Sequence, residues 1–451
     1  MSNKINNKGE VLAWSMYDFA NQPFTNLVVT FIYGTFFTTV IASNEIVGTQ
    51  QWSHAVSITA IIVALLSPFM GALADKGGYR KMFMLIFTWI TIIATTVLYF
   101  VLPGEILKAL FWFVIANIGF EMGSVFCNAY LPDISHSKNI GRVSGYGWSL
   151  GYVGGLFALA LAMLFLVQTD TPIFGFGKGE AGAYENIRAT NLLVAIWFAV
   201  FSIPTFLFVK DHKPDTKAFL KNAKHTVKDF RSTANELREY PQIMRFLIAR
   251  LVYNDGLVTI FAFGGIYAAG TLDFTFDEIM MLGIVLNITA GIGAFLMGYL
   301  DDKVGGRMTL KVTLVGLMVA MLLAVFAPEI RPTLQYAFGG SFVPEWLNAK
   351  NIFWAAAVLI GAFSGPNQAA SRSLMGRFTP ESKKNEFFGF FAFSGKATAF
   401  AGPFLLGILT VAFESQRAGI SVIFFFFLIG FILLNRVNEK EGMKQGALIN
   451  E

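Results

Sequence analysis

The chain has 451 residues, of which 55% are hydrophobic and 14% charged, and its mean hydropathy is +0.58. A soluble protein would carry roughly 25% charged residues, so this composition excludes an ordinary soluble domain and favours a membrane protein. The net charge of +5 does not indicate a nucleic-acid partner, because the basic residues lie at the ends of apolar segments. The single cysteine, Cys127, excludes a disulfide framework.

Twelve apolar segments have the length of about 20 residues that crosses a bilayer as a helix. They lie at 12–41, 52–73, 81–102, 109–131, 143–168, 189–209, 242–269, 278–300, 308–327, 350–372, 386–411 and 418–435. We therefore expect an all-α integral membrane protein with twelve transmembrane helices in two pseudo-symmetric six-helix bundles. Residues 1–209 would form the first bundle and residues 242–451 the second.

The segment between the bundles, 210–241, is the longest charged stretch, with eight basic residues interleaved with five acids. It predicts an amphipathic cytoplasmic helix. A contact of its basic residues with anionic lipid is one alternative. A simple solvated linker is the other, and charge runs favour it.

The basic residues are distributed unequally between the two sides of the membrane. If both termini and every even-numbered loop face the cytoplasm, 25 of the 34 Lys and Arg residues lie on that side, six lie on the other and three lie within spans. Cytoplasmic loops carry an excess of Lys and Arg. This split therefore predicts that both termini are cytoplasmic.

One short polar turn occurs twice, at 70–81 and 297–308, each time after the second span of a bundle. Aligned without a gap, the two copies match at seven of twelve positions. Glycine lets the backbone reverse, and the acid can cap a neighbouring helix. A charged turn repeated at the equivalent place is typical of a duplicated helical transporter rather than of a turn that only sets topology. The turn residues that we single out are Gly71, Asp75, Lys76, Gly78, Arg80, Asp302, Lys303 and Arg307.

Polar side chains inside the spans follow a pattern of three. They gather on the first, fourth, seventh and tenth spans at helical spacing, whereas the third, sixth, ninth and twelfth spans carry no charge in their interiors. Charges at membrane depth usually face a cavity or a partner. With Lys396 of the eleventh span, the candidate solute or ion pathway is Asp18, Asn21, Gln22, Asn117, Glu121, Asn254, Asp255, Asn367 and Gln368.

Glu121, Asp255 and Lys396 fall near the middle of their spans. A buried carboxylate has a raised pKa and can carry a proton at neutral pH, so Glu121 or Asp255 is a candidate for proton coupling. The alternative is that one of them simply neutralises Lys396 or Arg250 in a fixed pair. Lys396 could equally bind a carboxylate or phosphate of the solute.

Several of these stretches resemble a known family. The sequence from Gly71 to Lys81 is similar to the loop 2–3 signature of the major facilitator superfamily, and residues 298–307 are similar to its weaker copy in loop 8–9. Further stretches resemble the branch that includes the vacuolar amino-acid effluxer of autophagy and its bacterial relatives. They are Trp14 to Asn21, Asn128 to Asp133 with Gly141 to Gly145, and Gln368 to Ser373 with Glu386 to Gly389.

The resemblance implies that the repeated turn is a gating loop, which locks and releases the two halves, and that the first, fourth, seventh and tenth helices line the pathway. It tilts the substrate toward an amino acid or another small zwitterionic solute. It also implies a bacterial cytoplasmic membrane, or a vacuolar-type membrane in a eukaryote.

We therefore expect a secondary transporter of a small polar solute that works by alternating access, with the proton as the candidate coupling ion. The alternative is a transporter-like receptor or a lipid-handling membrane protein. No metal spacing, nucleophile–base pair or nucleotide fingerprint occurs, so we expect neither an enzyme nor a cofactor. The expected partners are the solute and membrane lipid, without nucleic acid, and the protein would be a monomer.

Overall fold

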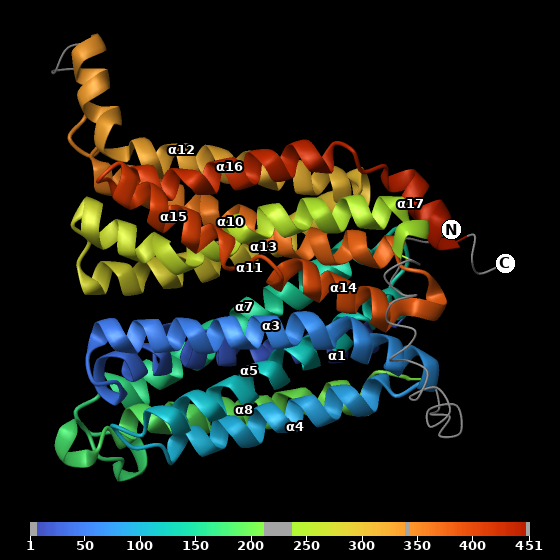
Figure 1. The fold of residues 1–451 in the computed structure, drawn as a ribbon, viewed down its shortest axis with the longest axis horizontal. Coiled ribbons are helices and arrows are strands. Elements are labelled where there is room, and N and C mark those ends of the chain that lie inside the picture. Colours follow the sequence, from blue (N-terminus) through green and yellow to red (C-terminus); the bar gives the residue numbers. More distant parts are fainter. Residues whose placement is uncertain (1–6, 212–236, 339–342, 448–451) are drawn as a thin grey trace.

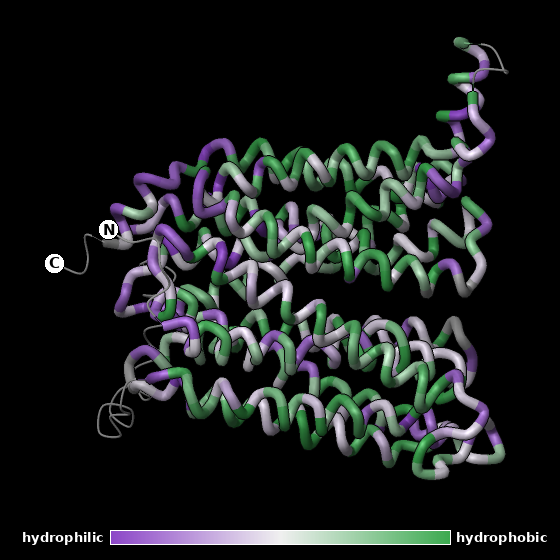
Figure 2. The backbone as a smooth tube through the Cα atoms, turned by 180° about the vertical axis from the view of Figure 1, so that it is seen from behind, coloured by the Kyte–Doolittle hydropathy of each residue, from purple (hydrophilic) through white to green (hydrophobic). Residues whose placement is uncertain are grey.

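The structure is a computed structural model that describes residues 7–211, 237–338 and 343–447. Within these ranges every regular element is a helix, and the long helices run side by side in two groups (Figure 1). Hydrophilic residues concentrate at the two ends of the long helices, with hydrophobic stretches between them (Figure 2). This is the pattern expected of helices that cross a bilayer.

The first group comes from the N-terminal half of the chain. Here α1 packs against α7 and α8, and α5 lies between α3 and α4. The long elements and their continuations are α1 (Lys8–Pro23), η1 (Phe24–Phe31), α2 (Tyr33–Phe36), η2 (Phe37–Ile41), α3 (Glu45–Gly77), α4 (Arg80–Tyr99), α5 (Ile106–Asn128), α6 (Leu131–Ile134), α7 (Ile140–Ala162), η3 (Met163–Val167) and α8 (Glu185–Phe208).

The second group comes from the C-terminal half. Here α13 packs against α11 and α12, and α16 packs against α10, α12 and α15. Its elements are α10 (Pro241–Leu272), α11 (Phe276–Val304), α12 (Gly306–Phe338), α13 (Ala349–Phe378), α14 (Lys384–Lys396), α15 (Ala401–Ala412), α16 (Gln416–Leu434) and α17 (Glu439–Ala447). Short 3₁₀ turns lie between helices in both halves: η4 (Ile173–Gly175) and η5 (Glu180–Gly182) precede α8, η6 (Leu237–Glu239) precedes α10, and η8 (Glu381–Lys383) precedes α14.

Eleven helical segments of the described chain are long and apolar enough to cross a membrane. The tenth expected span is α13, which has 30 residues but is not among them. Its polar side chains, such as Asn367 and Gln368, lower its mean hydropathy. With α13 included, the arrangement is consistent with twelve spans in two six-helix bundles.

The two bundles touch mainly through α3 with α14 and α7 with α11, and α13 and α14 also contact α7 and α5. Glycines allow both approaches, because the space that a Cβ would fill at Gly389 is occupied by the Ser67 carbonyl, and that at Gly145 by the Ala294 carbonyl. The Ser67 hydroxyl also donates to the Gly389 carbonyl at 3.0 Å.

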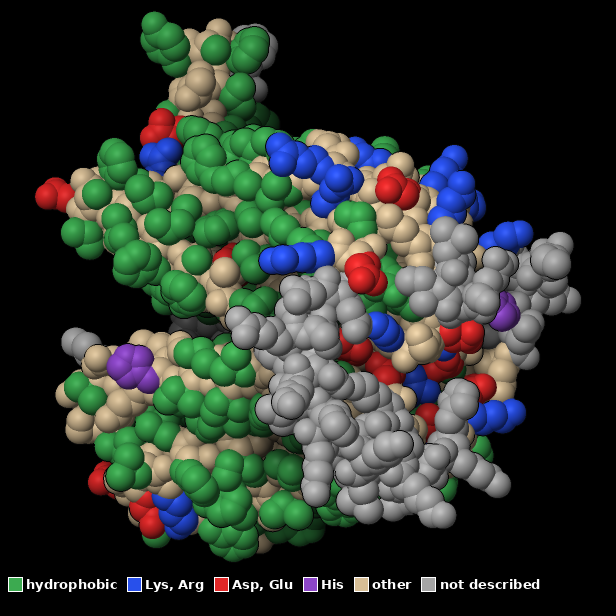
Figure 3. Space-filling model, turned by 45° about the vertical axis from the view of Figure 1, so that its right-hand side comes forward, with side chains coloured by type: hydrophobic (Ala, Val, Ile, Leu, Met, Phe, Trp, Pro, Cys, Tyr) green, Lys and Arg blue, Asp and Glu red, His purple; other side chains and the backbone are tan. Residues whose placement is uncertain are grey.

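The contact between the bundles is uneven along the helices. α3 packs closely along α14, whereas α15, which continues the same span, packs mainly against α10 and α16 of its own bundle. Figure 3 shows a recess between the two halves at the end away from the termini. The bundles are therefore closed together at the end that carries the termini and apart at the other.

Two spans differ from the expected single helices. The segment 386–411 is interrupted by turns at 397–400, between α14 and α15. The first span passes through Pro23 without a break and continues as the π-helix η1, and a bend at Ile32 then separates η1 from α2. The helix expected in the linker 210–241 lies largely outside the described residues, because 212–236 are not among them.

The α3–α14 contact can be tested with two glycines. We expect Gly389→Ala to lower the apparent Tm in detergent, because the added Cβ meets the Ser67 backbone and overpacking costs about 1–3 kcal/mol. The control is Gly407→Ala in α15, where no atom lies within 4 Å of the new Cβ. Equal Tm values for the two variants would contradict the described packing.

Candidate functional site

The centre of the molecule holds an ion pair that joins the two bundles. Lys396 Nζ of α14 donates to Glu121 Oε1 of α5 at 2.6 Å. The two side chains are only 33% and 20% exposed. Lys396 is the last residue of α14, so the pair lies directly at the interruption between α14 and α15. Of the alternatives left open by the sequence, the geometry agrees with a pair between Glu121 and Lys396.

Helix α10 supplies the other polar groups beside this interruption. Asn254 Nδ2 donates to the carbonyl of Gly395 at 3.0 Å. Arg250 Nη1 donates to the Phe391 carbonyl at 2.6 Å and to Ser394 Oγ at 2.8 Å. Carbonyl groups at a helix end have no partner inside the helix, and a membrane offers no water to replace it. Asn254 therefore supplies a hydrogen-bond donor to a carbonyl at the end of α14, where the interruption removes the helical partner.

Asp255 is the second carboxylate at this level. It is 2% exposed, and no basic side chain of the described chain lies within ion-pair distance of it. Among the described residues no hydrogen bond reaches its Oδ1, and the hydroxyl of Thr398, in the interruption, lies beside the carboxylate. A buried carboxylate without a cation is costly while it is ionised, so it is a natural place for a proton or a cation.

Asp18 lies in a different cluster, closer to the termini. Its Oδ2 accepts from Arg372 Nη1 at 2.8 Å across the boundary between the bundles. The same guanidinium donates to Asn128 Oδ1 at 3.0 Å, and to the hydroxyl and carbonyl of Ser144 at 3.0 and 2.7 Å. The Trp14 ring centroid lies 4.7 Å from Arg372 Cζ. Three helices of the first bundle thus hold one arginine of the second.

The remaining predicted pathway residues do not all meet. Asn367 Nδ2 donates to Thr313 Oγ1 at 2.9 Å inside its own bundle, and its Oδ1 is buried without a partner in the part of the chain described. Asn21 and Asn117 are buried, whereas Gln22 and Gln368 are half-buried. Sequence reasoning missed Asn26, whose Nδ2 lies 3.4 Å from Asn287 Oδ1 of the other bundle.

The aspartates of the repeated turn make equivalent contacts in the two halves. Asp75 accepts from the backbone N–H groups of Asn385 and Glu386, at the start of α14, at 3.1 and 2.8 Å. Asp302 accepts from the N–H groups of Gly141 and Arg142, at the start of α7, at 2.9 and 3.3 Å. Each carboxylate therefore caps a helix of the opposite bundle, where the positive end of the helix dipole stabilises it.

The other turn residues act within their own halves or shape the backbone. Arg80 Nη1 pairs with Asp133 at 2.7 Å, and Arg307 Nη2 donates to the Asn435 carbonyl at 2.8 Å. Gly78 ends α3 with a left-handed φ of 66°. The space beside Gly71 is filled by the Asn385 backbone. The Lys303 side chain is exposed, and the side chain of Lys76 lies outside the described residues.

Several ionic residues at this end were not predicted. Asp301 pairs with Arg377 and accepts from Ser373, and Asp133 pairs with Lys384 of the opposite bundle. The sequence did hold a signal for Asp301, because the second copy of the turn has this additional acid where the first copy has Ala74. Lys384 had no such signal.

The duplication extends to two further carboxylates. Asp211, after the last helix of the first bundle, accepts from the Lys81 N–H at 2.9 Å. Glu439, which follows α16 and begins α17, accepts from the N–H groups of Gly306 and Arg307 at 3.0 and 2.9 Å. Both therefore cap the helix that follows the repeated turn in their own half.

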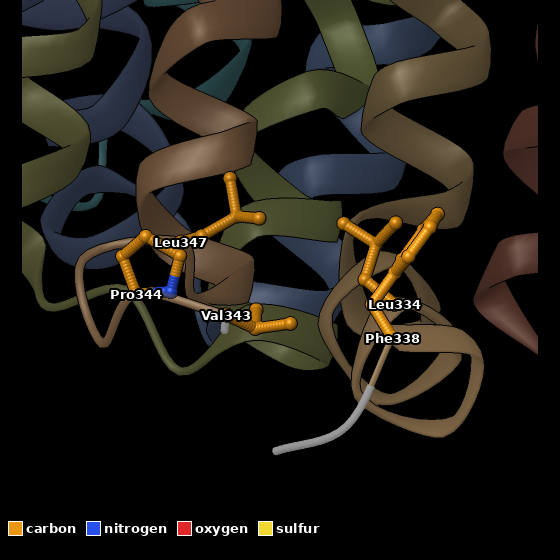
Figure 4. Close-up of a pocket in the computed structure, with 5 residues that line it drawn as sticks. All are labelled: Leu334, Phe338, Val343, Pro344 and Leu347. Carbon is orange, nitrogen blue, oxygen red and sulfur yellow. The ribbon is translucent and has the colours of Figure 1, made fainter. Parts of the chain in front are cut away.

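A separate apolar pocket of about 390 Å³ lies far from these charges, at the outer end of α12 (Figure 4). Leucine, phenylalanine, valine and proline side chains line it: Leu334, Phe338, Val343, Pro344 and Leu347. Because these side chains are apolar, the pocket is a poor site for a polar solute. Among the residues that the structure describes, no group of His, Cys, Asp or Glu could hold a metal ion.

The helical architecture and the paired contacts between the halves define the class of protein, which is a membrane transporter of the major facilitator fold. Solved structures share this fold over almost the whole chain. The proton:xylose symporter XylE has a TM-score of 0.69 at 11% identity and covers 98% of both chains. A bacterial homologue of the iron transporter ferroportin, in an outward-facing state, has a TM-score of 0.67 at 12% identity, over 95% of this chain and 98% of its own.

The chain belongs to the family described as Vacuole effluxer Atg22 like, which matches residues 6–447. It is 26% identical to the uncharacterized MFS-type transporter YxiO of Bacillus subtilis (strain 168), over 95% of this chain and 94% of that protein. It is 24% identical to autophagy-related protein 22 of Saccharomyces cerevisiae (strain ATCC 204508 / S288c), over 72% of this chain and 62% of that protein. The expected family, the fold class and the absence of an enzyme among the relatives are thereby confirmed.

The Asp18–Arg372 pair can be tested by a double-mutant cycle. We expect Arg372→Gln to cost ~3–5 kcal/mol, because it leaves the Asp18 carboxylate largely buried and unpaired. Adding Asp18→Asn should recover part of that loss. Chemical denaturation in detergent measures both. The control, Lys108→Gln, removes an exposed pair and should change stability by less than about 1 kcal/mol. Purely additive single effects would show that the two side chains do not interact.

Proposed function

We propose that the protein is a secondary transporter that moves a small polar solute by alternating access of its two bundles. The observation that carries the proposal is the uneven contact between them. Charged groups hold the bundles together at one end, the helices are apart at the other, and a polar cluster lies between the two. A protein that exposes a central site to one side at a time needs this arrangement.

In this proposal the repeated turn is the gate at the end that carries the termini. Asp75 and Asp302 cap helices of the opposite bundle, so these hydrogen bonds must break when that end opens. Gly71 and Gly78 would permit the close approach and the reversal of the chain. Arg80, Arg307, Lys76 and Lys303 would anchor each turn to its own half or to the cytoplasmic surface.

The bundles of the proposal are residues 1–209 and 242–451, joined by the linker 210–241. The excess of basic residues at the end that carries the termini supports cytoplasmic termini. With YxiO of Bacillus subtilis among the relatives, a bacterial cytoplasmic membrane is the proposed location, and a vacuolar-type membrane applies to a eukaryotic host. We propose that one chain suffices, because the central cluster draws on both bundles of a single chain.

The proposed solute is an amino acid or a similar small zwitterion. Both signs of charge are present at the centre, in Glu121 and Asp255 on one hand and in Arg250 and Lys396 on the other. The name of the family, vacuole effluxer, agrees with an exported or recycled small solute. A lipid substrate would call for an apolar pathway, which these polar side chains do not provide.

In this proposal proton coupling is assigned to Asp255 rather than to Glu121. Glu121 is bound to Lys396 at 2.6 Å, whereas Asp255 is buried and has no cation within ion-pair distance in the described chain. Asp255 would then take up a proton in one conformation and release it in the other.

The direct test is uptake into proteoliposomes of labelled amino acids, peptides and sugars, with and without an imposed proton gradient. We expect the amino-acid pool to accumulate and the accumulation to collapse with an uncoupler. Binding without movement, seen as thermal stabilisation by a solute that never enters the vesicles, would instead indicate a receptor.

Replacing each carboxylate by its amide tests the roles of Asp255 and Glu121 separately. We expect Asp255→Asn to abolish accumulation driven by the gradient while counterflow exchange continues, because a side chain that cannot ionise cannot carry a proton. Glu121→Gln should keep the dependence on the gradient but raise KM, because Lys396 loses its partner. If both variants retain wild-type gradient dependence, proton coupling through these residues is wrong.

A further inference from the structure

Buried basic side chains in this protein have acidic partners, with two exceptions among the residues that the structure describes. The paired ones are Arg80 and Lys384 with Asp133, Arg142 with Asp302, Arg372 with Asp18, Arg377 with Asp301, and Lys396 with Glu121. Arg188, near the outer end of α8, is held by the carbonyls of Tyr99 and Ala183. The exception inside the central cluster is Arg250 of α10, which is 7% exposed and has no described carboxylate within 4 Å.

The guanidinium of Arg250 is held firmly on one side only. Its Nη1 donates to the Phe391 carbonyl at 2.6 Å and to Ser394 Oγ at 2.8 Å, and its Cζ lies 3.6 Å from the Phe391 ring centroid. Its Nε is buried without a hydrogen-bond partner, and its Nη2 makes no hydrogen bond to the described residues. The free donors are therefore the Nε–H and Nη2–H groups, which form the edge that binds two oxygens of a carboxylate side by side.

The free edge lies beside the interrupted span. Gly395, the residue before Lys396, has no side chain to cover Arg250, and a Cβ there would meet Nη1 at 2.8 Å and Nη2 at 3.0 Å. Asn254, one turn along α10, fixes the Gly395 carbonyl. The Glu121 carboxylate of the same cluster is already bound to Lys396.

We propose that Arg250 binds a carboxylate group of the transported solute through its Nε and Nη2 atoms. The inference rests on the proposed transport function and names the chemistry that the site selects. Since Lys396 is neutralised by Glu121, Arg250 supplies the uncompensated positive charge. One guanidinium edge matches one planar carboxylate of single charge, whereas a doubly charged phosphate would call for a second free cation.

The competing role for Arg250 is structural, because its contacts with Phe391 and Ser394 also tie α10 to α14. A structural role predicts a loss of stability or of all transport when Arg250 is changed. It does not predict a change in which solutes the protein prefers. Selectivity between a carboxylate and its uncharged amide therefore distinguishes the two roles.

The test measures that selectivity on the full chain. Uptake of a labelled mixture of L-amino acids into proteoliposomes is inhibited with unlabelled amino acids, with the corresponding amino-acid amides and with the corresponding 2-oxo acids. Thermal stabilisation by the same three sets measures binding independently of transport. The variants are Arg250→Gln, Arg250→Lys and the control Arg245→Gln, which changes an exposed arginine of the same helix.

For the wild type and for Arg245→Gln we expect amino acids to inhibit at concentrations about 100-fold lower than their amides, the effect of a bidentate charge-assisted pair. Inhibition by 2-oxo acids would show that the carboxylate is sufficient for recognition. Inhibition by amino acids but not by 2-oxo acids would show that the protein recognises the ammonium group as well. In either case the role of Arg250 is supported if the ratio between the inhibitory concentrations of the amides and of the acids falls to about 1 in Arg250→Gln. The ratio should recover in part in Arg250→Lys.

Two results would overturn the proposal. In the first, Arg250→Gln folds and keeps the preference for acids over amides. In the second, the wild type neither moves nor binds carboxylates better than amides. Transport of sugars or peptides in that second case would leave the proposed function standing. Conversely, binding of carboxylates that depends on Arg250, without uptake, would support the site and contradict transport.

Discussion

The whole arrangement depends on how this chain neutralises charge where water is scarce. Carboxylates and guanidinium groups in a membrane interior must have partners, because the cost of leaving them ionised and unpaired is several kcal/mol or more. At the end that carries the termini, many of those partners belong to the opposite bundle: Asp18 with Arg372, Asp133 with Lys384, and Arg142 with Asp302. The conformation of the protein is therefore coupled to which charges are paired.

The same constraint would make the proposed closure reversible. Asp75 and Asp302 are bound by backbone N–H groups of the opposite bundle. Hydrogen bonds of this kind contribute about 1 kcal/mol each when water can replace them, so water entering at the end that carries the termini can substitute for them one at a time. The central cluster differs, because Arg250 and Asp255 lack charged partners among the described residues even in the closed arrangement. A solute and a proton are the groups that could complete it.

The sequence was sufficient for the architecture and for part of the site. Apolar segments of membrane length and the repeated turn predicted the two bundles, since these signals are local. The pairing of Glu121 with Lys396 remained one of several alternatives, because partners 275 residues apart depend on how helices pack. For the same reason the spacing of acids and bases gave no sign of Asp133 with Lys384. The interruption of the eleventh span was hidden, since 386–411 is apolar enough on average to cross the membrane as one helix in spite of Lys396.

The most direct test of the account is the distance between the bundles at each end, measured by double electron–electron resonance in lipid. Spin labels at the exposed positions 138 and 381 report the end that carries the termini, and labels at 50 and 411 report the other. With Cys127 replaced by alanine, the account predicts that a transported solute produces a second population of molecules. In that population the distance between positions 138 and 381 is longer and the distance between positions 50 and 411 is shorter. Distances that stay single and unchanged at saturating solute would contradict alternating access.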